Sequence, residues 1–149
     1  MARKFYQGKY MPIHKQKYLG NWNDINFRSR WELLTFKYCD LSDKVIYWNS
    51  EEVIIPYVCS TDGKIHNYHV DLFVQWKNGS RMLVEVKPEK DAKPAKQGKN
   101  RNPNTILNET FVYEKNKSKW KAAEIFAKDR GMIFQVWTEP ALRSLGIHI

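Results

Sequence analysis

Cysteine is scarce in this chain of 149 residues, which contains only Cys39 and Cys59. Neither belongs to a Cys-x-x-Cys pair or to a cluster of Cys and His. This spacing argues against a structural zinc site and against a fold held together by disulfides. We therefore expect two free thiols in a reducing compartment.

Long apolar runs are also missing. The longest, VIIPYV at residues 53–58, is too short to cross a bilayer. The first 18 residues are charged and have no apolar stretch, so no secretory signal is predicted. Aromatic residues are plentiful, with six Trp, eight Tyr and seven Phe, which favours a folded core. We expect one domain over residues 1–149.

Acidic residues are outnumbered, because 25 Lys and Arg face 16 Asp and Glu and give a net charge of +9. Such a surplus indicates a polyanionic partner, most often nucleic acid. An anionic membrane surface is the rival, but no basic amphipathic helix with a spare apolar face is found. We predict DNA as the partner, with no membrane and no small-molecule cofactor.

Two segments concentrate the positive charge. Residues 1–23 form a basic arm without an acid, and residues 88–104 form a loop rich in Lys, Pro, Asn and Gly. The arm is predicted to lie on the domain or on nucleic acid, and a solubilising tail is an equal alternative. The loop is predicted to be a flexible flap that neutralises DNA phosphates, against a plain disordered loop. The proposed phosphate contacts are Lys15, Lys17, Lys90, Lys93, Lys96, Lys99 and Arg101.

Hydrophobic periodicity predicts an α/β fold. Residues 26–41 read as a helix, capped at Asn26 or Ser29. Its apolar stripe is Phe27, Trp31, Leu34, Tyr38 and Leu41. Strands are expected at 51–58, 65–76, 81–87 and 132–137, a second helix at 109–130, and a short helix from Pro140. Trp120, Ala123, Ile125, Phe126 and Ala127 are expected to face inward from the second helix. The order αβββαβ predicts a mixed four-stranded sheet flanked by helices.

The hairpin between the second and third strands decides whether Asp71 and Glu85 share a face. A two-residue Asn-Gly loop would send the two carboxylates to opposite sides of the sheet. A three-residue loop over 77–79 pairs Trp76 with Ser80 and sets Asp71 opposite Glu85. We predict the three-residue form, with Gly79 at positive φ.

Two opposed carboxylates repel each other, and a divalent cation removes the repulsion. Mg²⁺ prefers oxygen ligands and needs few protein carboxylates when phosphate and water supply the rest. The carbonyl of Val86 is a further candidate ligand. Lys87 lies one step along and is placed to hold the attacking water. This set suits hydrolysis of a phosphodiester.

Asp71 followed by Glu85-Val86-Lys87 resembles the motif of the PD-(D/E)xK nucleases, although Val70 stands at the position of the Pro. This resemblance implies a restriction-endonuclease-like core that uses Mg²⁺, with Mn²⁺ able to substitute. It also assigns Glu32 to the metal site. Ser29-Arg30-Trp31-Glu32 also matches a capping box, and from the residues alone the two roles of Glu32 are equal.

The chain also resembles, over nearly its full length, the head-completion nucleases of T-even-type bacteriophages. The blocks that carry this resemblance are KFYQGKY, FRSRWELLTFKYCD, PYVCSTDGKIHNYHVDLFV and NKSKWKAAEIFA. It implies a nuclease that acts on packaged DNA, with portal or neck proteins as possible partners. It also implies a location in the host cytoplasm during virion assembly or with the virion. The segment RSRWE followed by EVK is similar to endonuclease subunits of heteromeric transposases.

Other polar residues received weaker assignments. Asn116 and Lys119 are predicted to contact a phosphate from the second helix, whereas an ordinary solvated face explains each lysine there equally simply. Tyr68 and His69 are expected beside the site without binding metal. Glu51 and Glu52 are expected to begin a strand, with a metal role as the lesser alternative. A DNA-binding connector protein without catalysis and a nuclease of transposition or repair remain the rival functions.

Overall fold

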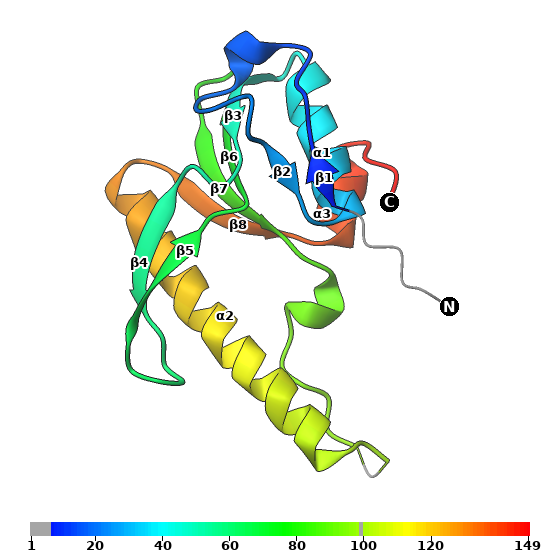
Figure 1. The fold of residues 1–149 in the computed structure, drawn as a ribbon, viewed down its shortest axis with the longest axis vertical. Helices are drawn as coiled ribbons and strands as arrows, with labels where there is room; N and C mark the ends of the chain where they lie inside the picture. Colours follow the sequence, from blue (N-terminus) through cyan, green and yellow to red (C-terminus); the bar gives the residue numbers. More distant parts are fainter. Residues whose placement is uncertain (1–6, 99) are drawn as a thin grey trace.

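A four-stranded mixed sheet forms the centre of the protein (Figure 1). The structure is a computed structural model and describes residues 7–98 and 100–149. The strand order is β3 (Val45–Asn49), β6 (Leu72–Trp76), β7 (Arg81–Val86) and β8 (Ile133–Trp137). β3, β6 and β7 are antiparallel neighbours, and β8 is parallel to β7. This confirms the predicted restriction-endonuclease-like architecture.

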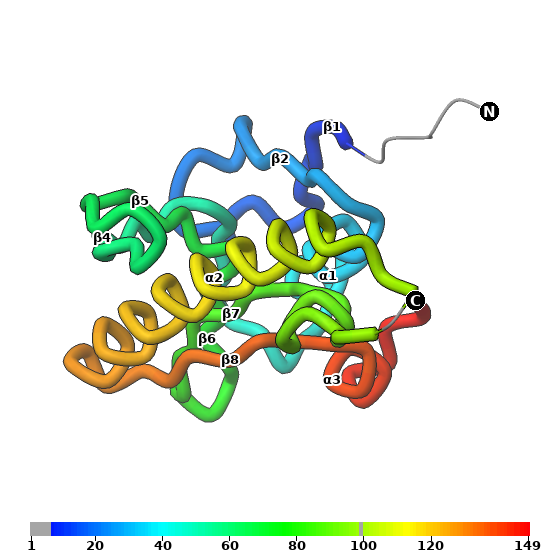
Figure 2. The backbone as a smooth tube through the Cα atoms, turned by 90° about the horizontal axis from the view of Figure 1, so that it is seen from below, coloured from blue at the N-terminus to red at the C-terminus, as the bar shows by residue number. Residues whose placement is uncertain are grey.

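Helices cover both faces of the sheet (Figure 2). The helix α1 (Arg30–Leu41) packs on one face, where Phe36 and Cys39 meet Leu72 and Val84. The helix α2 (Pro103–Asp129) packs on the other face. There Ala123 and Ala127 lie in one cluster with Phe73 and Leu83. The short helix α3 (Glu139–Ser144) and the C-terminal residues join the α1 side.

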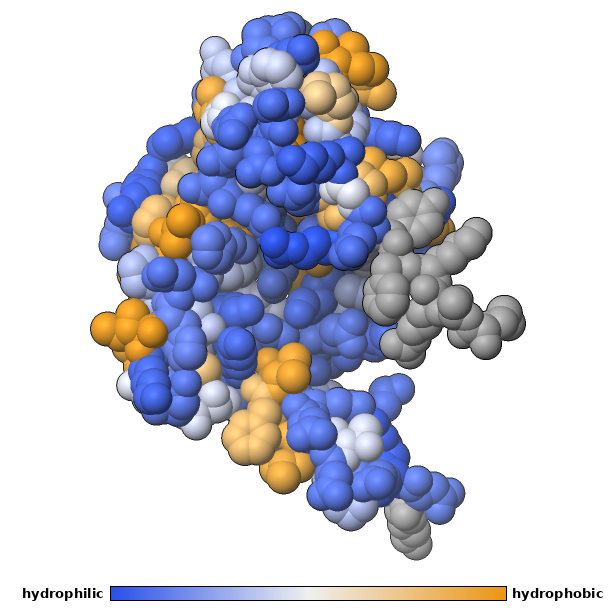
Figure 3. All heavy atoms as spheres, in the orientation of Figure 1, coloured by the Kyte–Doolittle hydropathy of each residue, from blue (hydrophilic) through white to orange (hydrophobic). Residues whose placement is uncertain are grey.

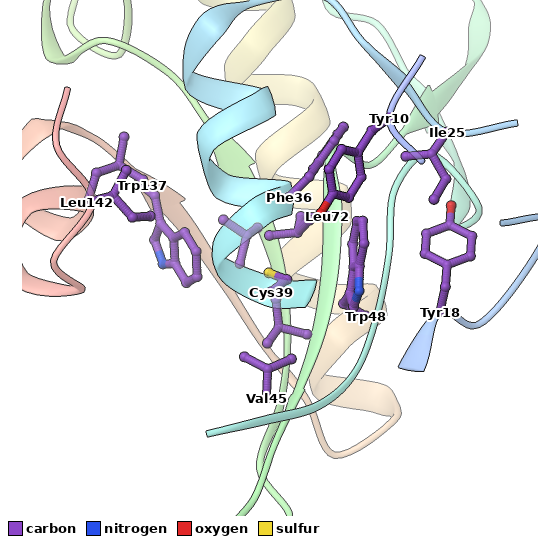
Figure 4. Close-up of a cluster of buried hydrophobic side chains, with 13 residues drawn as sticks. Tyr10, Tyr18, Ile25, Phe36, Cys39, Val45, Trp48, Leu72, Trp137 and Leu142 are labelled. Carbon is purple, nitrogen blue, oxygen red and sulfur yellow. The ribbon is translucent and has the colours of Figure 1, made fainter. Parts of the chain in front are cut away.

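The α1 side holds an aromatic cluster centred on Trp48 (Figure 4). The Trp48 ring lies 4.9 Å from the ring of Tyr18 and 5.4 Å from that of Phe36. Trp48 comes from β3, a strand that the sequence reading missed. The segment 51–58 had been predicted to be the first strand of the sheet, and that assignment is wrong.

The residues of that segment instead form a separate hairpin. β4 (Ile54–Val58) pairs only with β5 (Ile65–His69), as a two-stranded sheet. Pro56 lies in this ribbon, where a missing N–H is tolerated. Its Asp-Gly turn is present as predicted, with Gly63 at a φ of +69°.

The strand predicted over 65–76 is broken at Val70 and Asp71. β5 ends at His69 and β6 begins at Leu72 in a different sheet. Val70 therefore packs in the α2-side cluster, whereas Leu72 packs in the α1-side cluster. Asp71 occupies the bend between the two sheets, a position that the alternation pattern alone does not reveal.

The hairpin register, in contrast, was predicted correctly. Leu72 pairs with Val84 and Gln75 with Arg81. The same register continues to Trp76 and Ser80, whose backbone N–H and C=O lie 2.8 Å apart. Gly79 has a φ of +90°. The register therefore sets Asp71 across from Glu85.

Both long helices differ from their predicted bounds. α1 begins at Arg30 because Ser29 caps it, and residues Asn26–Phe27 form the strand β2, which pairs with β1 (Gly8–Lys9). α2 begins at Pro103, earlier than predicted, because Asn102 provides a cap and Pro suits the first turn. Leu41 and Ile125, expected in the core, are both 55% exposed. Gly131 ends α2 as predicted, at a φ of +70°.

The N-terminal segment packs on the domain in the part that is described. Asp40, fully buried at the end of α1, accepts hydrogen bonds from the Tyr10 hydroxyl and from the backbone N–H groups of Ile13 and His14. A short 3-10 helix (Lys15–Lys17) follows, and Lys17 donates to the carbonyls of Asp40 and Ser42. The arm is thus an anchored part of the fold from residue 7 onward.

The outer surface shown in Figure 3 is mostly hydrophilic, with separate apolar groups. Within residues 7–98 and 100–149, no helix has both the length and the apolar character that a bilayer span requires.

We expect Asp40→Ala to lower the free energy of unfolding by roughly 3 kcal/mol, since three buried donors lose their acceptor. Urea titration would measure the change. Asp43→Ala removes the same charge from an exposed position nearby and should change stability by less than about 0.5 kcal/mol. Equal effects of the two substitutions would contradict this account of the arm.

Candidate nuclease site

A polar cavity of about 610 Å³ opens where the bend meets the end of β7. It is lined by five carboxylates and only two cations. The carboxylates are Asp24, Glu51, Glu52, Asp71 and Glu85, and the cations are Arg28 and Lys119. Tyr68 and His69 also line it, as predicted. The protein thus carries a net positive charge of +9 around a cavity that is itself acidic.

Asp71 and Glu85 form the inner wall. They continue the α2-side face that Phe73 and Leu83 begin, because alternate residues of a strand share a face. Glu85 is only 6% exposed. Burial and the nearby charge of Glu85 raise the pKa of Asp71 to about 8, although the N–H of Val86 donates to its Oδ2 at 3.0 Å. Burial likewise raises the pKa of Glu85.

Two aromatic residues hold the Glu85 carboxylate. The indole N–H of Trp120, from α2, donates to Glu85 Oε2. Tyr68 packs beside it with a buried hydroxyl that lacks a hydrogen-bond partner among the described residues. Burial, followed by the charges of Glu85 and Asp71, raises the pKa of this hydroxyl. The sequence reading placed Trp120 in the core because its spacing from Ala123 and Ala127 is helical.

Two lysines neutralise part of this acidic wall. Lys87 follows β7, and its ammonium favours the ionised forms of both Asp71 and Glu85. Lys119 reaches the cavity from α2, with Nζ 5.5 Å from the centroid of the Tyr68 ring. Burial lowers the pKa of Lys119, and the charge of Glu85 opposes this shift. Each lysine lies where a phosphate oxygen would approach the carboxylates.

Glu32 combines the two roles between which the sequence was divided. Its backbone N–H donates to Ser29 Oγ, and its Oε2 accepts from the N–H of Arg28 at 3.1 Å, one residue before the cap. Its charge also raises the pKa of Asp71. Burial raises the pKa of Glu32 itself. The carboxylate therefore supports its helix while it belongs to the electrostatic environment of Asp71.

Glu51 belongs to the same environment. Its carboxylate pairs with the guanidinium of Arg28 at 2.5 Å and raises the pKa of Glu32. It is the one non-glycine residue with a positive φ, +59°, among those the structure describes. Such a conformation costs an L-residue about 1–2 kcal/mol.

The inner wall fits a hard divalent cation. Asp71 and Glu85 offer carboxylate oxygens from adjacent strands, and both have raised pKa values that a cation would lower. Glu32 does not join them in a tight group of three. Within the described residues, the one set with three ligand atoms within 4.8 Å of each other is Cys59, Asp62 and His66. Asp62 and His66 already pair at 2.7 Å and close the β4–β5 turn.

The predicted DNA contacts have varied surroundings. Lys119 lines the cavity. Lys15 stacks on Trp22, Lys17 binds backbone carbonyls, Lys93 pairs with Glu89, and Arg101 forms a double contact with Glu109. Lys90 and Lys96 are exposed, and Asn116 is buried. Lys99 lies outside the described residues. Their contacts with DNA stay predictions.

Two comparisons with known proteins agree with this geometry. The sequence pattern of the family described as "TnsA-like endonuclease N terminal" matches residues 42–139. That segment contains Asp71, Glu85 and Lys87. The chain belongs to the TnsA-like endonucleases. A "Head completion nuclease" of Enterobacteria phage T4 is 35% identical over 144 residues, which span 95% of this chain and 96% of that protein.

Family membership confirms both resemblances drawn from the sequence. A TnsA-like endonuclease domain is PD-(D/E)xK-like, and nucleases of this type generally use a divalent metal. The matched segment begins at residue 42 and so leaves out α1. The part of Glu32 in the site therefore depends on the structure and on the likeness to the phage protein.

The pKa of Asp71 predicts a specific pH dependence. Between the ordinary value of 3.8 and about 8, the folded protein keeps a proton that the unfolded chain has lost. Stability without metal therefore falls as the pH rises through this window. We expect Asp71→Asn to flatten the decline in melting temperature between pH 6 and pH 9, and millimolar Ca²⁺ to lessen the decline in the wild type.

Asp43→Asn serves as the control, because Asp43 is exposed. Wild type and Asp71→Asn melting curves that decline in parallel would show that Asp71 is not buried in the way described.

Trp120 is expected to be a positioning residue. Trp120→Phe keeps the ring but removes the donor to Glu85. Cleavage should slow about tenfold, and the pH of half-maximal activity should rise, because the indole N–H lowers the pKa of Glu85. Trp137→Phe is the matched control, since its indole donates to Gln135. An unchanged pH profile in Trp120→Phe would refute the positioning role.

Proposed function

We propose that this protein is a metal-dependent DNA nuclease that hydrolyses phosphodiester bonds during completion of the phage head. The acidic cavity in a basic protein carries the proposal. DNA would be repelled by five carboxylates unless a cation neutralised them. The outer positive charge attracts the phosphate backbone.

The proposed roles follow from position. Asp71 and Glu85 hold a divalent cation, Mg²⁺ in the cell with Mn²⁺ able to replace it. Glu32 and the carbonyl of Val86 are the further candidate ligands. When bound, the cation supplies Lewis-acid activation of the phosphate and of a water. The site thus needs no cofactor beyond the metal.

The protein's own groups do the positioning. Lys87 orients the attacking water and stabilises charge that develops on the phosphate. Lys119 holds a phosphate oxygen across the cavity from Arg28. Trp120 fixes the Glu85 carboxylate, so this ligand need not reorganise when substrate arrives. Lys15, Lys17, the lysines and arginine of residues 88–104, and Asn116 are proposed to contact the flanking backbone.

The setting is inferred from the relative. A protein named head completion nuclease, alike over nearly the full length of both chains, supports a function on packaged DNA before the tail joins. Portal or neck proteins would then be neighbours, and the protein would act in the host cytoplasm during assembly or stay with the virion. Both endonuclease and exonuclease action are proposed.

The decisive experiment compares cleavage with DNA binding. With Mg²⁺ and both linear and closed circular duplex, Glu85→Gln and Lys87→Ala should lose at least about 100-fold in rate. Binding in Ca²⁺, followed by fluorescence anisotropy, should stay near the wild-type level. Cleavage of the closed circle tests endonuclease action directly.

Lys37→Ala removes the same charge from an exposed position on α1 and is the control. If Glu85→Gln still cuts DNA at the wild-type rate, the assigned site is wrong. If the wild type binds DNA but never cuts it with Mg²⁺ or Mn²⁺, a non-catalytic connector protein is the better description.

A further inference from the structure

Glu51 has a side chain that its backbone conformation does not explain. Its φ of +59° is one that glycine adopts easily and that other residues rarely adopt. Its N–H donates to the carbonyl of Val70 at 3.0 Å, which ties it to the residue before Asp71. Glycine would make the same bond without strain. The glutamate must therefore be retained for its carboxylate.

That carboxylate lines the same cavity as Asp71 and Glu85, and it is largely buried, with 23% of the side chain exposed. Its partner is Arg28, whose side chain is 68% exposed. The N–H of Arg28 meanwhile donates to Glu32. Arg28 thus brings one positive charge between two acids at the rim, while its guanidinium can turn outward into solvent.

A second observation points to a bound group inside this cavity. The hydroxyl of Tyr68 is buried in its wall and lacks a hydrogen-bond partner among the described residues. Buried hydroxyls are normally satisfied, so a ligand or a cation-bound water is the natural acceptor or donor here. The lining also keeps a surplus of three carboxylates over cations.

We propose that Glu51 is a further cation ligand of the nuclease site, held inward by its strained backbone, and that Arg28 is the counter-cation it exchanges when a divalent cation binds. This inference rests on the proposed nuclease function. Arg28, once released, points toward solvent at the rim of the cavity and becomes available to a DNA phosphate. Strain at a residue that faces a site is a recurrent sign of function.

Two substitutions at position 51 separate this role from a structural one. Without metal, Glu51→Gly should raise the melting temperature by roughly 2–4 °C, because it relieves the strain. Both Glu51→Gly and Glu51→Gln should weaken binding of Mn²⁺ at least about tenfold, measured by isothermal titration without DNA. Both should slow cleavage at low Mn²⁺ and recover as Mn²⁺ rises.

Arg28→Ala gives a further contrast. If Arg28 is only a structural ion-pair partner, its loss should lower stability and leave Mn²⁺ binding unchanged. If it is the counter-cation, its loss should tighten Mn²⁺ binding. Glu52→Gln is the matched control, since Glu52 lines the cavity with an ordinary φ and accepts from Tyr18 and Asn21. It should bind Mn²⁺ as the wild type does.

The proposal is overturned if Glu51→Gln and Glu51→Gly both bind Mn²⁺ and cut DNA like the wild type. Its failure differs from failure of the nuclease assignment. If Glu85→Gln is inactive while both Glu51 variants are normal, only the role of Glu51 is lost. If Glu85→Gln is itself active, the whole site is misplaced.

Discussion

The opposition of Asp71 and Glu85 across the first pair of β6 and β7 is the constraint on which the site depends. It exists because the chain bends after Val70 and leaves the β4–β5 hairpin for the central sheet. Two buried carboxylates placed this way raise each other's cost of ionisation. The fold therefore carries an electrostatic deficit at this point, and a divalent cation with DNA is what removes it.

The deficit was readable from the sequence because it needs only two local facts. Alternation along a strand places Leu83 and Glu85 on one face, and the length of the loop at 77–79 fixes which residue stands opposite. Both facts are set by nearest neighbours and by Gly79 at positive φ. The membership of β3 in the sheet could not be read in this way. Residues 45–49 and 51–58 are both good strands, and only contacts with distant Tyr18 and Phe36 decide that the first joins the core.

Residues that serve two purposes were the hardest to predict. Glu32 satisfies the start of α1 and still influences Asp71, so the alternatives weighed for it are not exclusive. Trp120 has the spacing of a core residue and packs as one on α2, yet its indole N–H reaches Glu85. Periodicity reports which way a side chain points and says nothing about where its polar atom ends. Glu51 was expected to begin a strand for the same reason, because backbone strain leaves no trace in local composition.

The basic residues divide into those that attract DNA and those that build the protein. Lys17 and Arg101 were predicted to contact phosphate, but the first closes the end of α1 and the second pairs with Glu109 at the start of α2. They still add to the long-range potential, since an ion pair or a backbone contact does not remove a net charge of +9. The attraction is therefore diffuse and the cavity itself stays acidic. Binding of DNA and admission of its phosphate to the catalytic residues must then be separate events, and only the second requires the metal.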